Sequence, residues 1–197
     1  MPLQPAPTPS CFPPLPRSVA ALGTRRPDGS ANFMALAWQT PLSYEPPLVG
    51  VVVGREKASH RFLFECPDFT LSFLSLGAAG LVQALGTSSG ARADKVNTLR
   101  LRLLAPQHGN APMLADSWLA YECRVVARHA TGDQTLFVGE ILGAYYDPRH
   151  FESGELSKEA RPLIQAGEAS YASLGERCHP ADAPDRSVDG GDEAAKG

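Results

Sequence analysis

The chain has 197 residues, which is enough for one domain with a well-buried core, and 43% of them are hydrophobic, as is usual for a globular protein. Its formal net charge of −3 argues against nucleic acid or a polybasic membrane contact as partner. No run reaches the roughly eighteen apolar residues that a membrane span needs. Prolines near the N-terminus interrupt any signal-peptide-like apolar region, so we expect a cytoplasmic protein.

The cysteines and histidines do not have the spacing of a metal site or a disulfide framework. The four cysteines are widely scattered, and the five histidines form no i, i+4 pair on a predicted helix. We therefore expect free thiols and no bound metal.

The chain opens with an arm and a hairpin. Residues 1–16 are rich in proline and are expected to form an arm without regular structure. The apolar run Val19–Thr24 is followed by Pro27-Asp28-Gly29, a turn in which Pro fixes φ and Gly accepts a positive φ. A strand beginning at Ser30 or Ala31 then completes the hairpin.

This second strand leads into a bend that is rich in prolines. Alternation places Asn32, Met34, Leu36 and Trp38 on one face of the strand. Three prolines between positions 41 and 47 then fix the shape of the chain. An aromatic wall beside polar groups is typical of a ligand site, although a core Trp38 and a turn Asn32 fit the same pattern.

The next elements form a candidate anion site. The valine-rich segment Leu48–Gly54 is apolar on both faces, which predicts a central strand. Ala58–Cys66 is expected to be a short helix, ended by Pro67. Free amides at its start, with Lys57 and Ser59, would suit a phosphate. A solvated Lys57 and a Ser59 near the helix cap remain the alternative.

The remaining segments predict alternating short helices and long strands. We expect a strand over Phe69–Leu76, helices over Ala78–Leu85 and Ala91–Asn97, and two long strands, Trp118–Ala130 and Gln134–Tyr146, joined at Thr131-Gly132-Asp133. From Ala181 the chain lacks bulky apolar residues, so residues 178–197 are expected to be a disordered acidic tail. Helices that interrupt strands favour a small antiparallel β-barrel with helical insertions.

The segment Gly86-Thr87-Ser88-Ser89-Gly90 matches G-x-S-x-G, the nucleophile elbow of serine hydrolases. That motif needs a strand before its serine, whereas the residues before Ser88 predict a helix. The alternative is ligand contact through Ser88, Ser89 and Lys95. A solvated lysine paired with a carboxylate is the ordinary interpretation of Lys95.

Taken together, these motifs and their order resemble the flavin reductase-like family, the FMN-binding split-barrel proteins that include flavoredoxins. The resemblance covers about residues 15–177. The residues that carry it are Asn32, Met34, Trp38, Thr40, Pro41, Ser43, Pro46, Pro47, Lys57, Ser59, Gly86, Ser89, Gly90, Asp94, Lys95, Gly132, Asp133, Thr135, Leu136, Phe137, Gly139, Glu140, Tyr171, Leu174 and Gly175.

The resemblance implies a split-barrel domain over residues 17–177 that binds FMN as a homodimer, with no catalytic side chain required. The ring would lie along Asn32 to Thr40, and Lys57, Ala58 and Ser59 would hold the phosphate. Ser88, Ser89 and Lys95 would complete the ribityl and ring contacts, and Tyr171 would flank the ring from its own or the partner subunit. The full set of implied cofactor-binding residues is Asn32, Met34, Ala37, Trp38, Gln39, Thr40, Lys57, Ala58, Ser59, Ser88, Ser89, Lys95, Gln134 and Tyr171.

One position departs from the family pattern. Relatives often have histidine where this chain has Gln134, which can form hydrogen bonds but cannot titrate near neutral pH. The resemblance implies an oxidoreductase that transfers hydride from NAD(P)H to flavin, with a monooxygenase or electron-acceptor protein as candidate partner. An FMN electron carrier without its own catalysis is the alternative, and a serine hydrolase is a distant one.

Overall fold

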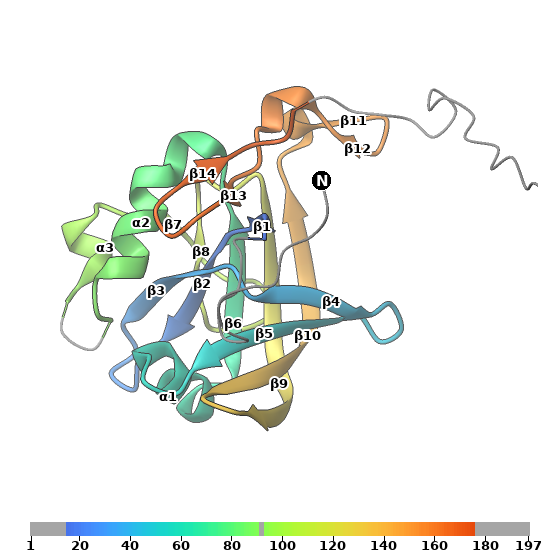
Figure 1. The fold of residues 1–197 in the computed structure, drawn as a ribbon. Coiled ribbons are helices and arrows are strands. Elements are labelled where there is room, and N and C mark those ends of the chain that lie inside the picture. Colours follow the sequence, from blue (N-terminus) through green and yellow to red (C-terminus); the bar gives the residue numbers. More distant parts are fainter. Residues whose placement is uncertain (1–14, 91–92, 176–197) are drawn as a thin grey trace, which may run out of the picture.

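A large antiparallel sheet forms the body of the protein. The structure is a computed structural model that describes residues 15–90 and 93–175. The sheet has seven strands, and every neighbouring pair is antiparallel. The sheet curls into a split β-barrel (Figure 1). The helix Ala58–Glu65 lies at one end of the barrel, and the helices Ala79–Thr87 and Lys95–Thr98 lie beside the strand Ala31–Leu36. The expected barrel is confirmed, while the expected arm up to residue 14 and the tail over 178–197 lie outside the described residues.

The elements have the following bounds. The sheet contains β2 (Ala20–Arg25), β3 (Ala31–Leu36), β4 (Gln39–Ser43), β5 (Leu48–Gly54), β6 (Asp68–Phe73), β9 (Leu119–Thr131) and β10 (Gln134–Tyr146). Their order across the sheet is β3-β2-β6-β9-β10-β5-β4. Shorter strands are β1 (Arg17–Ser18), β7 (Leu103–Leu104), β8 (Met113–Leu114), β11 (Phe151–Glu152), β12 (Glu155–Leu156), β13 (Ile164–Gln165) and β14 (Tyr171–Ala172). The helices are α1 (Ala58–Glu65), α2 (Ala79–Thr87) and α3 (Lys95–Thr98), with 3₁₀ turns η1 (Leu76–Ala78), η2 (Pro148–His150) and η3 (Lys158–Ala160).

Both predicted hairpins are present. The β2–β3 turn has Gly29 at a φ of 80°, and Asp28 Oδ1 accepts hydrogen bonds from the backbone N–H and the hydroxyl of Ser30. The β9–β10 hairpin turns at Gly132, whose φ is 63°. Glycine at both places removes the Cβ clash that a positive φ would cause.

Several boundaries differ from the predicted ones. The strand β6 ends at Phe73 rather than Leu76, because the chain turns into η1. The helix α3 is only Lys95–Thr98, and Asp94 caps it by accepting a hydrogen bond from the N–H of Asn97; positions 91–92 of the expected helix lie outside the described residues. The valine-rich β5 is internal as expected, but only β4 separates it from the edge of the sheet.

Trp38 does not continue the alternation of β3. That strand ends at Leu36, and the chain bends before β4 begins at Gln39. Trp38 is therefore 47% exposed, while Asn32 on β3 is buried. The expectation that these two side chains share a face of one strand is wrong, because alternation holds only while the backbone stays extended.

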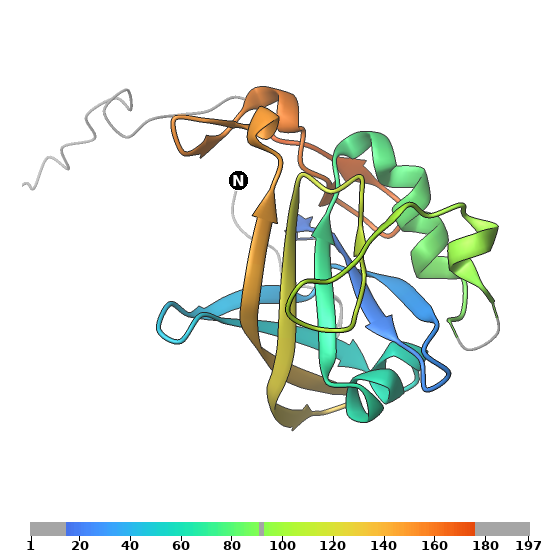
Figure 2. The same ribbon diagram turned by 180° about the vertical axis from the view of Figure 1, so that it is seen from behind.

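The core has two parts. The first lies inside the barrel and includes Leu22, Val51, Phe69, Leu71 and Phe137. The second lies between the β2–β3 edge and α2, where Phe33, Val82 and Leu85 pack together, and it is covered by the C-terminal segment (Figure 2). Burial of these side chains fixes α2 beside β3, which positions the site described below. Across the described residues, no helix is long and apolar enough to cross a membrane.

A buried carboxylate on β9 holds a long loop against the barrel. Glu122 accepts hydrogen bonds from the backbone N–H groups of Gln107, His108 and Gly109 and from the hydroxyl of Tyr145. Burial alone would raise the pKa of Glu122, but these donors outweigh it and hold that pKa below its ordinary value of 4.5. The carboxylate thus replaces the water that these backbone groups would otherwise need.

We predict that Glu122→Gln lowers the free energy of unfolding at pH 7 by about 1 to 3 kcal/mol, because an amide cannot accept all four hydrogen bonds with charge assistance. Since the folded-state pKa of Glu122 is lowered, its contribution exists above pH 4.5 and is lost as pH falls through the folded-state value. Urea denaturation at pH 7 and at pH 3 should therefore show a smaller loss at the lower pH. The exposed Glu45→Gln is the control, and an equal loss for both variants would contradict the assignment.

Candidate functional site

A cavity of about 510 Å³ lies between β3, the start of α1, the helix α2 and the hairpin formed by β13 and β14. Met34, Ala35 and Ala37 line it from the β3 side, and Val82 and Leu85 line it from α2. These apolar side chains face polar groups from the other walls. A volume of this size with a few convergent polar groups is typical of a site for a small organic ligand.

Asn32 on β3 has an unpartnered oxygen behind one wall of this cavity. Its side chain is 1% exposed, and Nδ2 donates hydrogen bonds to Thr24 Oγ1 at 3.1 Å and to Ser59 Oγ at 2.9 Å. Asn32 Oδ1 has no hydrogen-bond partner among the described residues. Gly90 packs so closely here that a Cβ at position 90 would lie 2.0 Å from that oxygen. A buried acceptor without a donor costs stability, which favours a site that a ligand completes.

The start of α1 brings a cation and free backbone donors to the same cavity. Lys57 is the cap residue, its side chain makes no capping hydrogen bond, and Ala58 and Ser59 form the first turn. The N–H groups of a first helical turn lack partners within the helix and attract anions. Lys57 Nζ lies 3.2 Å from Glu56 Oε1, and both side chains are more than half exposed. The Glu56 carboxylate therefore lies beside the Lys57 ammonium group, which is the group that would bind an anion at this helix start.

Lys95 is a buried cation that forms no ion pair with a carboxylate among residues 15–90 and 93–175. It is 3% exposed, and its Nζ donates to the carbonyl oxygens of Phe33 at 2.9 Å and Leu85 at 2.7 Å. Burial, and then the positive charges of Arg26 and Lys57, lower the pKa of Lys95 to about 8. Lys95 also lines the cavity. The ordinary interpretation of a solvated, carboxylate-paired lysine is thus wrong here.

The C-terminal segment closes the remaining side. Tyr171 on β14 lines the cavity, and its hydroxyl donates a hydrogen bond of 2.7 Å to Gln83 Oε1 on α2. Burial raises the pKa of Tyr171, so the phenol stays protonated at neutral pH. Gln165 and Glu168 from the same hairpin also line the cavity.

The structure brings most of the expected ligand residues together. Met34, Ala37, Lys57, Ala58, Ser59, Ser88, Ser89, Lys95 and Tyr171 line the cavity, and Asn32 bonds to one of them. Trp38, Gln39 and Thr40 instead line a second hollow of about 450 Å³ beside Arg17 and Ser18, which Ala37 also borders.

Gln134 is not among the cavity-lining residues. It opens β10 and pairs with Gly54, the last residue of β5. Sequence reasoning did not single out Glu56, Gln83, Gln165 or Glu168. Sequence position is the one signal that could have identified two of these residues. Gln83 lies on the helix just before the glycine- and serine-rich segment, and Glu56 directly precedes Lys57.

The G-x-S-x-G segment is not a nucleophile elbow. Gly86 and Thr87 belong to α2, and Ser88 follows as its C-terminal cap. Ser88 Oγ donates a hydrogen bond of 2.6 Å to the carbonyl oxygen of Ala84, one helical turn earlier. A helix precedes the serine where the elbow requires a strand, so the hydrolase geometry is absent at Ser88.

This split barrel with a cavity between β3, α1 and α2 defines a flavin reductase-type fold. The model of the family described as flavin reductase like domain matches residues 12–168, so the chain belongs to that family. The chain is 35% identical over 144 residues to an uncharacterized protein of Archaeoglobus fulgidus, which covers 73% of this chain and 77% of that one. It is 29% identical over 129 residues to an NADH-dependent FAD reductase of Streptomyces globisporus, covering 64% and 67%.

Solved structures agree with this assignment. The flavoredoxin of Methanosarcina acetivorans superposes with a TM-score of 0.81 at 27% identity, covering 91% of this chain and 95% of that chain. An FMN-binding protein of Thermus thermophilus with bound p-hydroxybenzaldehyde gives 0.77 at 27% identity, covering 93% and 99%. The expected family and fold are confirmed.

The buried ammonium group of Lys95 leads to a prediction about alkaline pH. Because the folded-state pKa is lowered to about 8, the charged form destabilises the fold, and this cost disappears as pH rises from 8 towards the ordinary value of 10.5. The wild type should therefore gain stability relative to Lys95→Met over that range, by about 1.4 kcal/mol per unit of pKa difference. Urea denaturation of both proteins at pH 7.5 and 10 measures it. A pH-independent difference between them would contradict a lowered pKa.

Proposed function

We propose that the protein is an FMN-binding oxidoreductase that transfers hydride from NAD(P)H to the flavin. The observation that carries the proposal is the cavity itself, in which the first turn of α1 and two lysines converge beside an apolar wall, with the unpartnered Asn32 Oδ1 behind one wall. The family membership and the relatives described above support a flavin as the ligand.

FMN fits the groups that the cavity offers. It joins a flat apolar ring, a hydroxylated chain and a dianionic phosphate, and the cavity has an apolar wall, hydroxyl groups and a cationic helix start. The hydroxylated chain and the ring N–H are donors of the kind that Asn32 Oδ1 lacks. Lys57 and the N–H groups of Ala58 and Ser59 would bind the phosphate. Ser88, Ser89 and Lys95 would contact the middle of the molecule.

The chain's own contribution is placement and electrostatics. FMN supplies the hydride-accepting chemistry when it is bound. The Lys95 ammonium group, held by two carbonyl oxygens, would add a fixed positive charge to the wall of the site. Tyr171 and the β13–β14 hairpin would exclude water from the side opposite α1.

A flavin-dependent electron carrier is the second candidate, and the likeness to a flavoredoxin supports it. The two functions need the same cavity but differ in the fate of the electrons. A carrier would retain FMN tightly and react slowly with nicotinamides, whereas a reductase would turn over. In either case a monooxygenase or another electron-acceptor protein is the partner that we propose downstream.

We also propose that the protein acts as a homodimer in the cytoplasm. The edge strand β4 and the residues on either side of it expose Trp38, Leu42 and Tyr44, with exposed fractions of 47%, 44% and 99%. β4 ends the order of the large sheet, so no strand of the described part of the chain pairs with its outer edge in that sheet. Apolar side chains along an open edge are a liability that a second subunit would remove.

Purification tests the function directly. We expect a yellow protein, or one that takes up added FMN with quenching of flavin fluorescence, and whose visible flavin absorption is bleached anaerobically by NADH or NADPH. Stopped-flow reduction with each nicotinamide, with and without excess FMN, separates a reductase from a carrier. A colourless protein that ignores FMN would overturn the proposal.

Lys57→Met should weaken FMN binding by about five-fold while leaving riboflavin binding unchanged, because riboflavin lacks the phosphate. The modest size follows from the exposure of Lys57 and from Glu56 beside it. Fluorescence titration with both ligands measures the ratio. Arg61→Met, an exposed cation on the same helix, is the control, and equal losses for FMN and riboflavin in Lys57→Met would contradict the phosphate assignment.

A further inference from the structure

Among the described residues, four charged side chains line the cavity, and their formal charges cancel. Lys57 and Lys95 supply two positive charges, and Glu56 and Glu168 supply two negative ones. The lowered pKa of Lys95, about 8, still leaves its ammonium group mostly charged at pH 7. A phosphate monoester carries nearly two negative charges at this pH. These lining residues therefore offer no net positive charge to match a phosphate.

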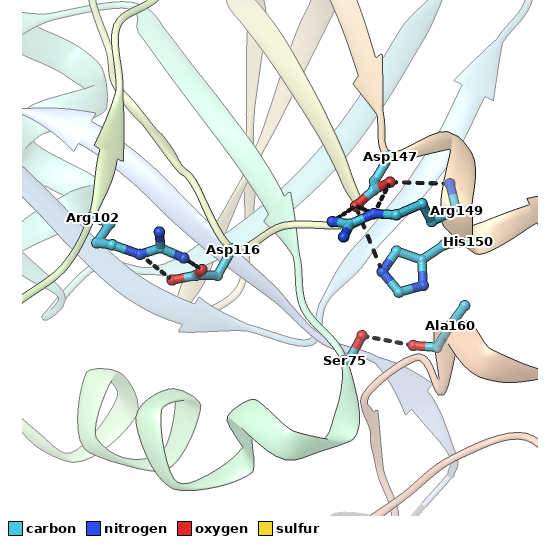
Figure 3. Close-up of polar contacts among 7 residues, drawn as sticks. All are labelled: Ser75, Arg102, Asp116, Asp147, Arg149, His150 and Ala160. Carbon is cyan, nitrogen blue, oxygen red and sulfur yellow. Dashed lines mark hydrogen bonds and ion pairs between the residues drawn. The ribbon is translucent and has the colours of Figure 1, made fainter.

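One of the carboxylates forms an ion pair inside the site. Glu56 and Lys57 both line the cavity, and Glu56 Oε1 lies 3.2 Å from Lys57 Nζ. The ion pair of Arg102 and Asp116, by contrast, joins two residues that do not line the cavity (Figure 3). Exposed ion pairs of either kind contribute little stability. The location of the Glu56–Lys57 pair is therefore its informative property.

The Glu56 carboxylate lies at the bend between β5 and α1. A Cβ at position 54 would lie 2.5 Å and 2.7 Å from its two oxygens, so the side chain folds back over Gly54, which has no side chain. Its own backbone N–H, and then the Lys57 ammonium group, hold the pKa of Glu56 below its ordinary value of 4.5. The carboxylate is therefore charged at neutral pH, directly before the first turn of α1.

A carboxylate and a phosphate bind to the same groups. Both are oxyanions that accept hydrogen bonds from an ammonium group, and both are favoured at the start of a helix. Because Glu56 already pairs with Lys57, a phosphate at α1 must displace the carboxylate or lie beside its negative charge. Either arrangement weakens the binding of a phosphate, and neither affects a flavin that lacks one.

We propose that Glu56 is a specificity-determining residue, whose carboxylate competes with the phosphate of FMN for the Lys57 ammonium group. The inference rests on the proposed function, since it names FMN as the ligand. Glu56 thereby lowers the preference of the site for FMN over riboflavin and speeds the release of FMN. A flavin held in this way is an exchangeable substrate of a reductase rather than the tightly retained cofactor of a carrier.

The test compares the wild type with Glu56→Gln, both as full chains. Fluorescence titration gives the dissociation constants of FMN and riboflavin, and dilution of the loaded protein gives the dissociation rate of FMN. We expect Glu56→Gln to bind FMN about three- to ten-fold more tightly, mainly through slower dissociation, and to bind riboflavin as the wild type does. Asp116→Asn removes a carboxylate from an ion pair outside the cavity, so it is the control and should change neither ligand.

A double-mutant cycle tests the competition for Lys57 itself. In the Lys57→Met background, Glu56→Gln should improve FMN binding by less than about two-fold, because no ammonium group remains to be released. A gain that persists in full in this background would overturn the competition.

The remaining outcomes separate this inference from the proposed function. Equal changes for FMN and riboflavin in Glu56→Gln would overturn the role of Glu56 while leaving FMN as the ligand, as would an unchanged or weaker FMN affinity. The Glu56 side chain is 65% exposed, so the variant should fold as the wild type does. A wild type that binds neither flavin would overturn the proposed function and this inference with it.

Discussion

The site depends on one buried ammonium group. Lys95 Nζ binds the carbonyl oxygens of Phe33 on β3 and Leu85 on α2, so a single side chain from α3 ties together the strand and the helix that face each other across the cavity. A buried charge without a counter-ion is costly, and its retention in this fold therefore needs a reason beyond stability. A ligand carrying negative charge would supply that reason. The apolar contacts of Val82 and Leu85 then keep the same two walls at a fixed separation.

Much of the architecture followed from local sequence patterns. Pro27-Asp28-Gly29 and Gly132-Asp133 predict turns because glycine tolerates a positive φ, and both hairpins form where expected. The bounds of β10 match the predicted Gln134–Tyr146, because its turn and its apolar pattern agree. The expected end of β6 was too late, and Ala93 and Asp94, which were expected in a helix, precede the start of α3 at Lys95. Both errors fall where tertiary contacts, rather than propensity, end an element.

The site was predictable only in part, and Trp38 shows why. Family resemblance and alternation both placed it with Asn32, yet the bend after Leu36 turns it towards a separate hollow with Gln39 and Thr40. Gln83, Glu56 and Glu168 reach the cavity from segments that are far apart in sequence. No local sequence pattern indicates that these three side chains lie around one cavity. Gln134, the position that departs from the family pattern, starts β10. His60 lies close to that end of the strand, with its Nε2 2.9 Å from Thr135 Oγ1. Burial, and then Arg55, lower the pKa of His60, which favours its neutral form.

The division of the core into two clusters has a consequence for how the protein is degraded by proteases. The cluster inside the barrel is enclosed by strands, whereas the cluster of Phe33, Val82 and Leu85 shares its outer boundary with the cavity. Cofactor loading would therefore protect the second cluster far more than the first, since occupancy stabilises the elements that it contacts. Molecules lacking flavin would be cut first around α2 and the C-terminal hairpin, and cellular proteases would in this way remove the unloaded protein selectively.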